Sequence, residues 1–253
     1  MSELTGAERL AARSRFATLL ALAVLTLLAW AWLLTGAGMT SMAMPMAGMP
    51  AMAWDARQWL IVIAMWWVMM VAMMLPSAAP VILLFGRVQR YRGDEPPTTA
   101  FLAGYIACWL GFALLAAALQ YLLEQAGFLS PMAMASLSPW LSGGLLIATG
   151  LYQWSPLKDA CLSNCRTPTD FLTRHYRPGA TGAWRMGLVH GAYCVGCCWL
   201  LMALLFVVGV MNLAWIAALT LLVAAEKLLP GGTWIARVSG AALILWGVIL
   251  IAR

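Results

Sequence analysis

The sequence contains few charged residues and very few histidines. Charged residues make up 9% of the 253 residues, there are only 2 histidines, and hydrophobic residues make up 64%. A soluble domain carries about 25% charged residues. A chain this apolar cannot hide its surface in a water-soluble fold, so its main solvent must be lipid. The composition excludes a soluble globular protein and predicts a polytopic membrane protein.

A nucleotide-binding motif and a long polar segment are also lacking. The longest polar stretch covers residues 155–183, which leaves no room for a soluble domain. The sequence contains no Walker motif that would cradle the phosphates of ATP. We therefore expect no ATP-driven pumping by this chain alone, and we expect that it is not an enzyme.

Apolar segments separated by Pro, Gly, Ser and Asn account for most of the chain. The segments are residues 16–34, 59–85, 100–123, 139–154, 186–210, 212–229 and 233–252. Since a bilayer crossing needs roughly 20 apolar residues, they predict an all-α, polytopic membrane helix bundle of about seven transmembrane helices. Residues 1–58 would hold the first helix and a Met-rich outer loop, and residues 59–253 a multi-helix membrane metal-binding domain.

The basic residues predict the orientation of these helices. With the N-terminus in the cytoplasm, every Lys and Arg except Arg57 and Arg253 falls on the inner side. This distribution follows the positive-inside rule and places the C-terminus in the periplasm. It also explains the net charge of +6 without any binding of nucleic acid.

Methionines concentrate in the first outer loop. This loop includes Met42, Met44, Met46 and Met49, spaced among Gly, Ala and Pro. Thioethers are soft, neutral donors that suit Cu(I), so the loop is a candidate site for collecting a soft metal ion. The alternative is a low-complexity linker in which Met serves as adaptable apolar filler.

One histidine and three cysteines lie close together in the segment 186–210. On a helix, His190, Cys194 and Cys197 fall within about 60° of one another, and Cys198 lies at the edge of the same face. Imidazole and thiolate together favour Cu(I), zinc or iron over hard cations. The alternative is that buried cysteines act as small hydrophobic residues. Gly187 and Gly191 beside this face predict close approach of a neighbouring helix.

Two further segments place candidate ligands at a similar membrane depth. Met69 and Met73 share a face of the segment 59–85, which also contains Pro76, and Glu226 lies about two turns above the inner boundary. The alternatives are packing for the methionines and a charge anchor for Glu226. We expect Lys227 to extend toward the inner interface. Depth alone leaves open whether these helices are neighbours.

The inner loop contains a second pair of cysteines, Cys161 and Cys165. In a reducing cytoplasm, paired cysteines favour metal binding or redox chemistry over a structural disulfide. The pair is a candidate for passing a metal ion between the membrane site and the cytoplasm, although an ordinary loop role is equally open.

Four sequence blocks resemble a bacterial family of predicted metal-binding integral membrane proteins, classed as a domain of unknown function. The blocks are MWWVMMVAMMLPS (65–77), GLYQWSPLKDACLSNC (150–165), GAYCVGCCWLLM (191–202) and GVMNLAW through AAEKLLPGG (209–232). The resemblance covers about residues 65–232. It implies a multi-pass protein of the bacterial inner membrane that binds metal, without naming the metal or the reaction.

These observations favour a protein that binds a soft metal ion, with Cu(I) as the leading candidate, for transport, as a metallochaperone or for metal homeostasis. Its expected partners are the lipid bilayer, the metal ion and a periplasmic or membrane metalloprotein. A second hypothesis is a membrane thiol-disulfide or quinone oxidoreductase, since Cys194 and Cys197 form a C-x-x-C pair. A third is an accessory subunit that helps to assemble a larger membrane metalloenzyme.

Overall fold

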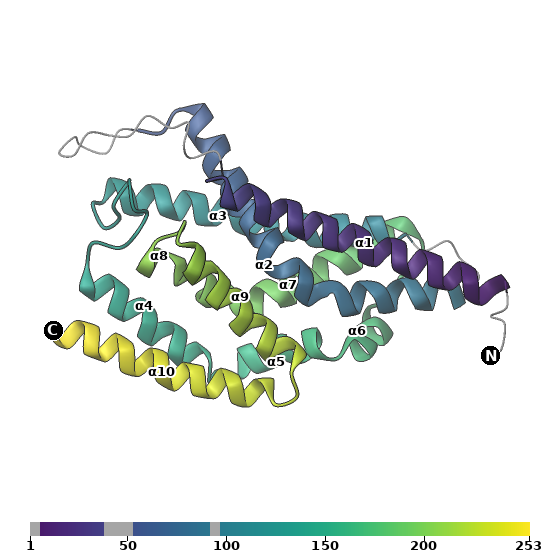
Figure 1. The fold of residues 1–253 in the computed structure, drawn as a ribbon. Helices are drawn as coiled ribbons and strands as arrows, with labels where there is room; N and C mark the ends of the chain where they lie inside the picture. The colour runs from purple at the N-terminus through teal and green to yellow at the C-terminus, as the bar shows by residue number, and fades with distance from the viewer. Residues whose placement is uncertain (1–5, 38–52, 92–96) are drawn as a thin grey trace.

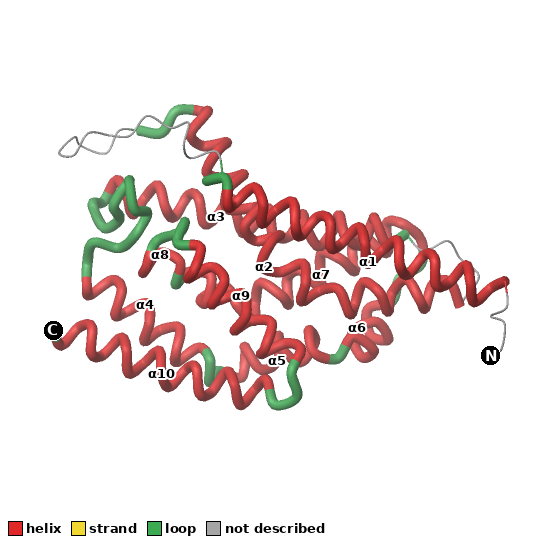
Figure 2. The backbone as a smooth tube through the Cα atoms, viewed as in Figure 1, coloured by secondary structure: helices red, strands yellow, loops and turns green. Residues whose placement is uncertain are grey.

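The computed structural model describes residues 6–37, 53–91 and 97–253, with side chains described from residue 15 onward. Nearly all of the described backbone is helical, and Figure 2 shows no strand in it. The helices are α1 (Gly6–Leu34), α2 (Ala56–Tyr91), α3 (Thr98–Gln125), α4 (Pro139–Tyr152), α5 (Pro156–Arg166), α6 (Pro168–His175), α7 (Gly179–Ala203), α8 (Leu205–Val208), α9 (Leu213–Leu228) and α10 (Gly232–Ala252). The expected all-α class is confirmed.

Five helical stretches in the described part of the chain are long and apolar enough to cross a membrane. They are Arg15–Leu34, Ala56–Tyr91, Thr98–Gln125, Gly179–Val208 and Gly232–Ala252. The two remaining apolar helices, α4 and α9, have 14 and 16 residues and correspond to the two short predicted segments. The beginning of α1 and the end of α10 lie at opposite sides of the bundle (Figure 1). Seven crossings and the orientation of the bundle stay predictions.

Helix α2 is the central element of the bundle. It runs unbroken for 36 residues with Pro76 and Pro80 inside it. Proline lacks an N–H and leaves the carbonyl of the residue four positions earlier without its helical partner. Packing on several sides keeps the helix continuous, because α2 lies against α1, α3 and α9 (Figure 1). As a result, its methionine-rich middle lies in the core.

Helices α3 and α7 approach each other very closely. A Cβ atom on Gly187 would lie 2.0 Å from the carbonyl oxygen of Phe101, and one on Gly104 would lie 2.0 Å from that of Trp184. No larger residue fits at either position without separating the two backbones. The small-residue contact expected at Gly187 is therefore confirmed, and α3 is the neighbouring helix.

The connection between α7 and α9 sets the position of α9. Gly209 adopts φ +121°, a left-handed conformation that a side chain disfavours. The side chain of Asn212 then caps α9 by accepting a hydrogen bond from the backbone N–H of Trp215 at 3.0 Å. The expected break near Asn212 is confirmed, and it returns the chain so that the end of α9 lies against α2.

The polar stretch after α4 folds into two short helices, α5 and α6. Ser155 caps α5 by accepting from the backbone N–H of Lys158 at 3.1 Å, and Pro156 occupies the first turn. Helix α5 packs on α7 where Gly196 leaves space: a Cβ there would lie 2.7 Å from Cys161 Sγ. This packing brings the inner-loop cysteines to the cysteine-bearing helix.

Candidate metal centre

The three cysteines of α7 lie in the interior of the bundle. Cys194, Cys197 and Cys198 are each 1% exposed. The thiols of Cys197 and Cys198 both donate hydrogen bonds to the backbone carbonyl of Cys194, at 3.1 and 3.0 Å. All six cysteines of the chain lie in its described part and are free thiols. The thiols of α7 are therefore present as separate sulfur donors.

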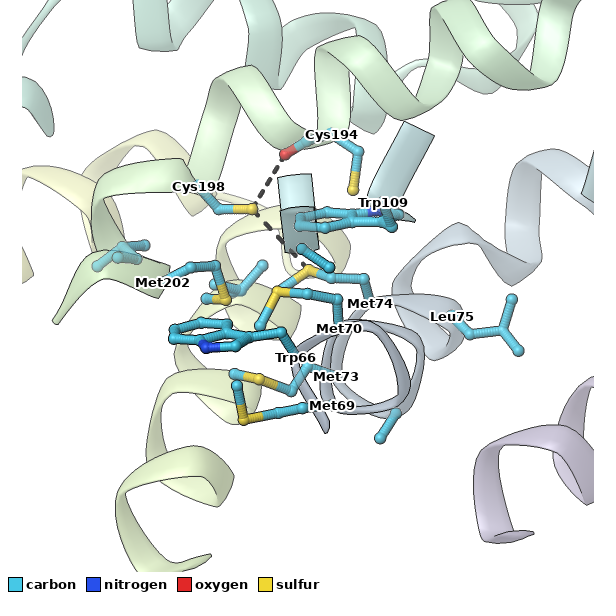
Figure 3. Close-up of a cluster of buried hydrophobic side chains, with 14 of the residues drawn as sticks. Trp66, Met69, Met70, Met73, Met74, Leu75, Trp109, Cys194, Cys198 and Met202 are labelled. Carbon is cyan, nitrogen blue, oxygen red and sulfur yellow. Dashed lines mark hydrogen bonds between the residues drawn. The ribbon is translucent and has the colours of Figure 1, made fainter. Parts of the chain in front are cut away.

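The sulfur atom of a methionine on α2 lies near the sulfur atom of a cysteine on α7. Cys198 Sγ lies 3.9 Å from Met74 Sδ. Figure 3 shows Met70 and Met74 on the side of α2 that faces α7, whereas Met69 and Met73 point in another direction. All four methionines are buried. The structure thus brings Met74, rather than the predicted Met69 and Met73, into contact with the cysteines.

A buried lysine is the most unexpected member of this group. Lys227 is 5% exposed, and its Nζ lies 2.9 Å from Cys194 Sγ, 3.4 Å from Ser77 Oγ and 3.8 Å from Met74 Sδ. A buried ammonium group requires a compensating charge. Among the described residues, Cys194 is the acidic side chain that contacts this ammonium, so it is the group placed to compensate the positive charge. The expectation that Lys227 extends to the inner interface is wrong.

Tyr105 of α3 also contacts the cysteine and methionine residues of this group. Its Oη lies 3.1 Å from Cys194 Sγ and 3.2 Å from the carbonyl oxygen of Met74. We call Met74, Tyr105, Cys194, Cys198 and Lys227 the sulfur pocket. It combines two thiols, one thioether, a phenol and an ammonium group from α2, α3, α7 and α9.

The cysteines of α5 lie next to the cysteines of α7. The side chain of Cys165 interacts with those of Cys194 and Cys197, and these hydrogen bonds, together with burial, raise the pKa of the Cys165 thiol well above its ordinary value. Burial and the nearby Cys197 also raise the pKa of the half-buried Cys161. The second pair of cysteines therefore extends the first toward the surface, with its thiols protonated at neutral pH.

His190 lies next to the sulfur pocket and is 2% exposed. Its ring centroid is 5.8 Å from that of Tyr105 and 4.9 Å from that of Phe171. Among the described residues, no hydrogen-bond partner meets its Nδ1. This leaves one buried imidazole nitrogen with an unused lone pair or proton at the edge of the pocket.

The carboxylate of Glu226 contacts residues outside the sulfur pocket. Its carboxylate forms an ion pair with the buried Lys158, 2.7 Å away, and accepts a hydrogen bond from Gln153 at 2.8 Å. Lys158 also donates to the Gln153 side chain, and Arg166 donates to the backbone carbonyl of Glu226 at 3.0 Å. Glu226 therefore joins α5 to α9 through its contacts with Lys158 and Gln153.

Sequence reasoning overlooked a second buried polar group, near the other end of α3. Trp66 donates to Gln120 at 2.8 Å, Gln120 donates to Glu124 at 2.9 Å, and Trp54 donates to the same carboxylate at 3.1 Å. The sequence signal was a Gln and a Glu four residues apart in an apolar helix, which places both on one face.

The predicted Met-rich outer loop lies outside the described residues. It contains Met42, Met44, Met46 and Met49.

The candidate ligands in the described part of the chain are too few for a metal ion that needs three or more His, Cys, Asp or Glu ligands. Within residues 15–37, 53–91 and 97–253, no three His, Cys, Asp or Glu side chains form a group that could hold a metal ion. A metal bound here must use fewer of these ligands together with a thioether. Cu(I) tolerates such a small, soft donor set better than the other candidate metals.

Comparison with known proteins identifies a matching family. The family model described as PpoB2, copper chaperone, matches residues 63–250. No curated protein and no solved structure matches the chain. The matched range includes every residue of the sulfur pocket, as well as Cys161 and Cys165, and it agrees with the resemblance to a metal-related membrane family.

Proposed function

The chain belongs to the PpoB2 family of copper chaperones, and we propose that it is an integral membrane metallochaperone that binds Cu(I) in the sulfur pocket. The single observation that supports this most directly is the contact between Cys198 Sγ and Met74 Sδ at 3.9 Å, beside Cys194. A metal–thiolate bond is about 2.3 Å long for zinc. An ion can therefore bridge the two sulfurs in a bent arrangement after small side-chain movements.

The chemistry of the pocket favours Cu(I) over zinc. Thiolates and thioethers are soft donors that select Cu(I), whereas structural zinc sites use four Cys, His or carboxylate ligands. The described residues offer no such set. His190 is the candidate for an additional ligand, because its buried ring lies beside that of Tyr105.

The ammonium group of Lys227 supports the same choice of ion. With no metal bound, it balances the negative charge of Cys194 at 2.9 Å. When a cation enters, the ammonium repels it in proportion to the charge of the ion. A divalent ion is therefore repelled about twice as strongly as Cu(I). In this proposal Lys227 stabilises the empty pocket and disfavours Zn(II).

A chain of sulfurs provides the route out of the pocket. Cys194 and Cys197 interact with Cys165, and Cys161 lies one helical turn away, half-buried near the surface of α5. Cu(I) would pass between these thiols by ligand exchange, with each new bond formed before the previous one is lost. The proposal involves no catalysed reaction. The receiver or donor at Cys161 would be a metalloprotein partner.

Metal analysis of the purified full chain tests this function. The detergent-solubilised protein, loaded with Cu(I) under reducing conditions, is expected to bind copper stoichiometrically, and X-ray absorption should show sulfur neighbours. Cys198→Ala and Cys194→Ala should each lose most of this copper. Cys108→Ala is the matched control, because Cys108 is a half-buried cysteine that packs against Gly191.

Two results would contradict the proposal. One is full retention of copper by a Cys194→Ala, Cys198→Ala double variant. The other is a metal-free protein whose Cys194 and Cys197 are oxidised and reduced with a quinone, which would favour the oxidoreductase alternative. An equal preference for Zn(II) in the wild-type chain would overturn the choice of Cu(I) alone.

A further inference from the structure

An open cavity lies between the end of α6 and the beginning of α7. Its volume is about 690 Å³. Residues Arg174, His175, Tyr176, Arg177, Trp184, Arg185, Met186, Leu188 and Val189 line it. This volume falls in the range of small-molecule sites, about 300–1,000 Å³. The proposed handling of copper uses none of the three arginines.

The charge of the cavity is entirely positive. The side chains of Arg174, Arg177 and Arg185 are exposed, and no aspartate or glutamate lines the cavity. Among the described residues, none of these three guanidinium groups forms an ion pair. Three unpaired guanidinium groups around one hollow favour an anionic ligand, and the planar donors of Arg match phosphate oxygens in a bidentate arrangement.

The cavity also has an apolar wall. Leu188 and Val189 are partly buried side chains of α7, and Trp184, which is 41% exposed, lies one turn before Leu188 and directly precedes Arg185. Trp is enriched where a membrane meets water. The cavity therefore offers a ligand both cationic and hydrophobic groups, which is the pattern that an amphipathic molecule needs.

The position of α7 places this cavity at headgroup depth. The helix has 25 residues, a length of about 37 Å, whereas the hydrocarbon core of a bilayer is about 30 Å thick. Its first turns therefore extend beyond the hydrocarbon. Arg185 lies in the second turn, and Arg174 and Arg177 precede the helix. In the orientation predicted from the basic residues, this end of the bundle lies in the inner leaflet, where anionic lipids attract basic groups.

We propose that this cavity binds the phosphate-bearing headgroup of an anionic phospholipid of the inner leaflet. The three guanidinium groups hold the headgroup, and Trp184, Leu188 and Val189 contact the beginning of the acyl chains. A free phosphate ion satisfies the arginines but leaves the apolar wall without a partner, so the lipid is the ligand that uses the whole site. The proposal is independent of copper binding.

Native mass spectrometry of the full chain released from nanodiscs tests the lipid site. With phosphatidylglycerol, the wild-type protein is expected to retain one lipid, and Arg177→Gln should weaken binding roughly fivefold, as for about one surface-proximal basic charge. The Arg174→Gln, Arg177→Gln, Arg185→Gln triple variant should weaken it about a hundredfold. Arg87→Gln and Arg237→Gln are matched controls, because both are exposed arginines outside the cavity.

Each outcome decides for or against the site. Selective retention of phosphatidylglycerol over phosphatidylcholine, lost in the cavity variants and kept in the controls, supports it. Equal loss in the controls indicates a general surface charge effect and overturns the proposal. Displacement of the lipid by inorganic phosphate at equal concentration assigns the arginines to a free anion and also overturns it. The single variant Arg177→Gln keeps the test decisive if the triple variant does not fold.

Discussion

The Nζ atom of Lys227 lies 2.9 Å from the Sγ atom of Cys194, and both residues are buried between the helices of the bundle. An ammonium group in this position balances the charge of a thiolate without any metal ion. It also competes with a metal cation for the same sulfur. If the proposed function is correct, the charge of the incoming ion is therefore a basis for selection.

Replacing Lys227 by leucine removes the competing positive charge. We expect Lys227→Leu to bind Zn(II) more strongly relative to Cu(I), with the ratio of the two dissociation constants shifted by about tenfold or more, since charges at about 4 Å interact by several kcal/mol at a protein surface. Competition titration with chelators of both metals measures the ratio. Lys227→Arg keeps the charge and is expected to keep the selectivity. An unchanged ratio in the leucine variant would contradict this role.

Replacing Met74 by leucine removes the thioether while nearly conserving volume. We expect the affinity for Cu(I) to fall by about tenfold or more. Losses of this size are common when residues around a metal site are replaced. The fold should lose less than about 1.5 kcal/mol of stability, as for other swaps of similar volume. Met69→Leu is the matched control, because Met69 is equally buried on α2 but points away from the cysteines (Figure 3). An equal loss of Cu(I) affinity in both variants would show that the contact of Met74 with the cysteines does not contribute to metal binding.

The sequence was sufficient to identify the class of fold and the helix that carries the cysteines. Hydrophobic length and breaker residues define helices independently of their neighbours, so the segments agree with α1–α4, α7, α9 and α10. The face formed by His190, Cys194 and Cys197 is also buried as one surface. These features depend on local periodicity, which the sequence contains in full.

The sequence was insufficient for the partners of that face. Which side of α2 faces α7 depends on the rotation of each helix about its axis, and this is set by packing such as the Gly104 and Gly187 contact with α3. A rotation of about 100° separates Met73 from Met74. The same difference separates Glu226 from Lys227. Depth therefore identified the turns of both helices that lie near the cysteines, but not that Met74 and Lys227 are the residues in contact with them.

The raised pKa of Cys161 gives a test by pH. The thiolate is the reactive form, and burial together with the nearby Cys197 raises the pKa of this thiol. Maleimide labelling of Cys161 should therefore be slow at neutral pH and increase with a midpoint above about 8.5, the value of a free cysteine. Because the folded-state pKa is the higher one, Cys161 stabilises the fold below the unfolded pKa and loses this contribution as pH rises through the folded pKa.

Mass spectrometry of labelled peptides over a range of pH measures that midpoint. Cys197→Ala removes one cause of the shift and should move the midpoint of Cys161 to lower pH. Cys108→Ala should leave the midpoint of Cys161 unchanged, because Cys108 does not contribute to the raised pKa of Cys161. A midpoint at or below that of a free cysteine would show that Cys161 is more exposed than its packing on Gly196 indicates.

The ion pair of Glu226 and Lys158 provides the last prediction. Both side chains are buried, with 1% and 0% exposure, so the loss of one partner leaves the other charge without compensation. We expect Glu226→Gln to destabilise the protein by about 3–5 kcal/mol and the Glu226→Leu, Lys158→Leu double variant to recover much of this loss. Thermal unfolding in detergent measures both changes.

The same variant separates a structural role of Glu226 from a metal-binding one. If Glu226 mainly holds α5 on α9, Glu226→Gln should increase the labelling rate of Cys165 while copper stoichiometry stays the same at low temperature. The protein should then bind Cu(I) in the sulfur pocket but transfer it more slowly to an acceptor, because Cys165 and Cys161 are displaced from Cys194 and Cys197. Loss of copper with unchanged labelling of Cys165 would instead identify Glu226 as a ligand.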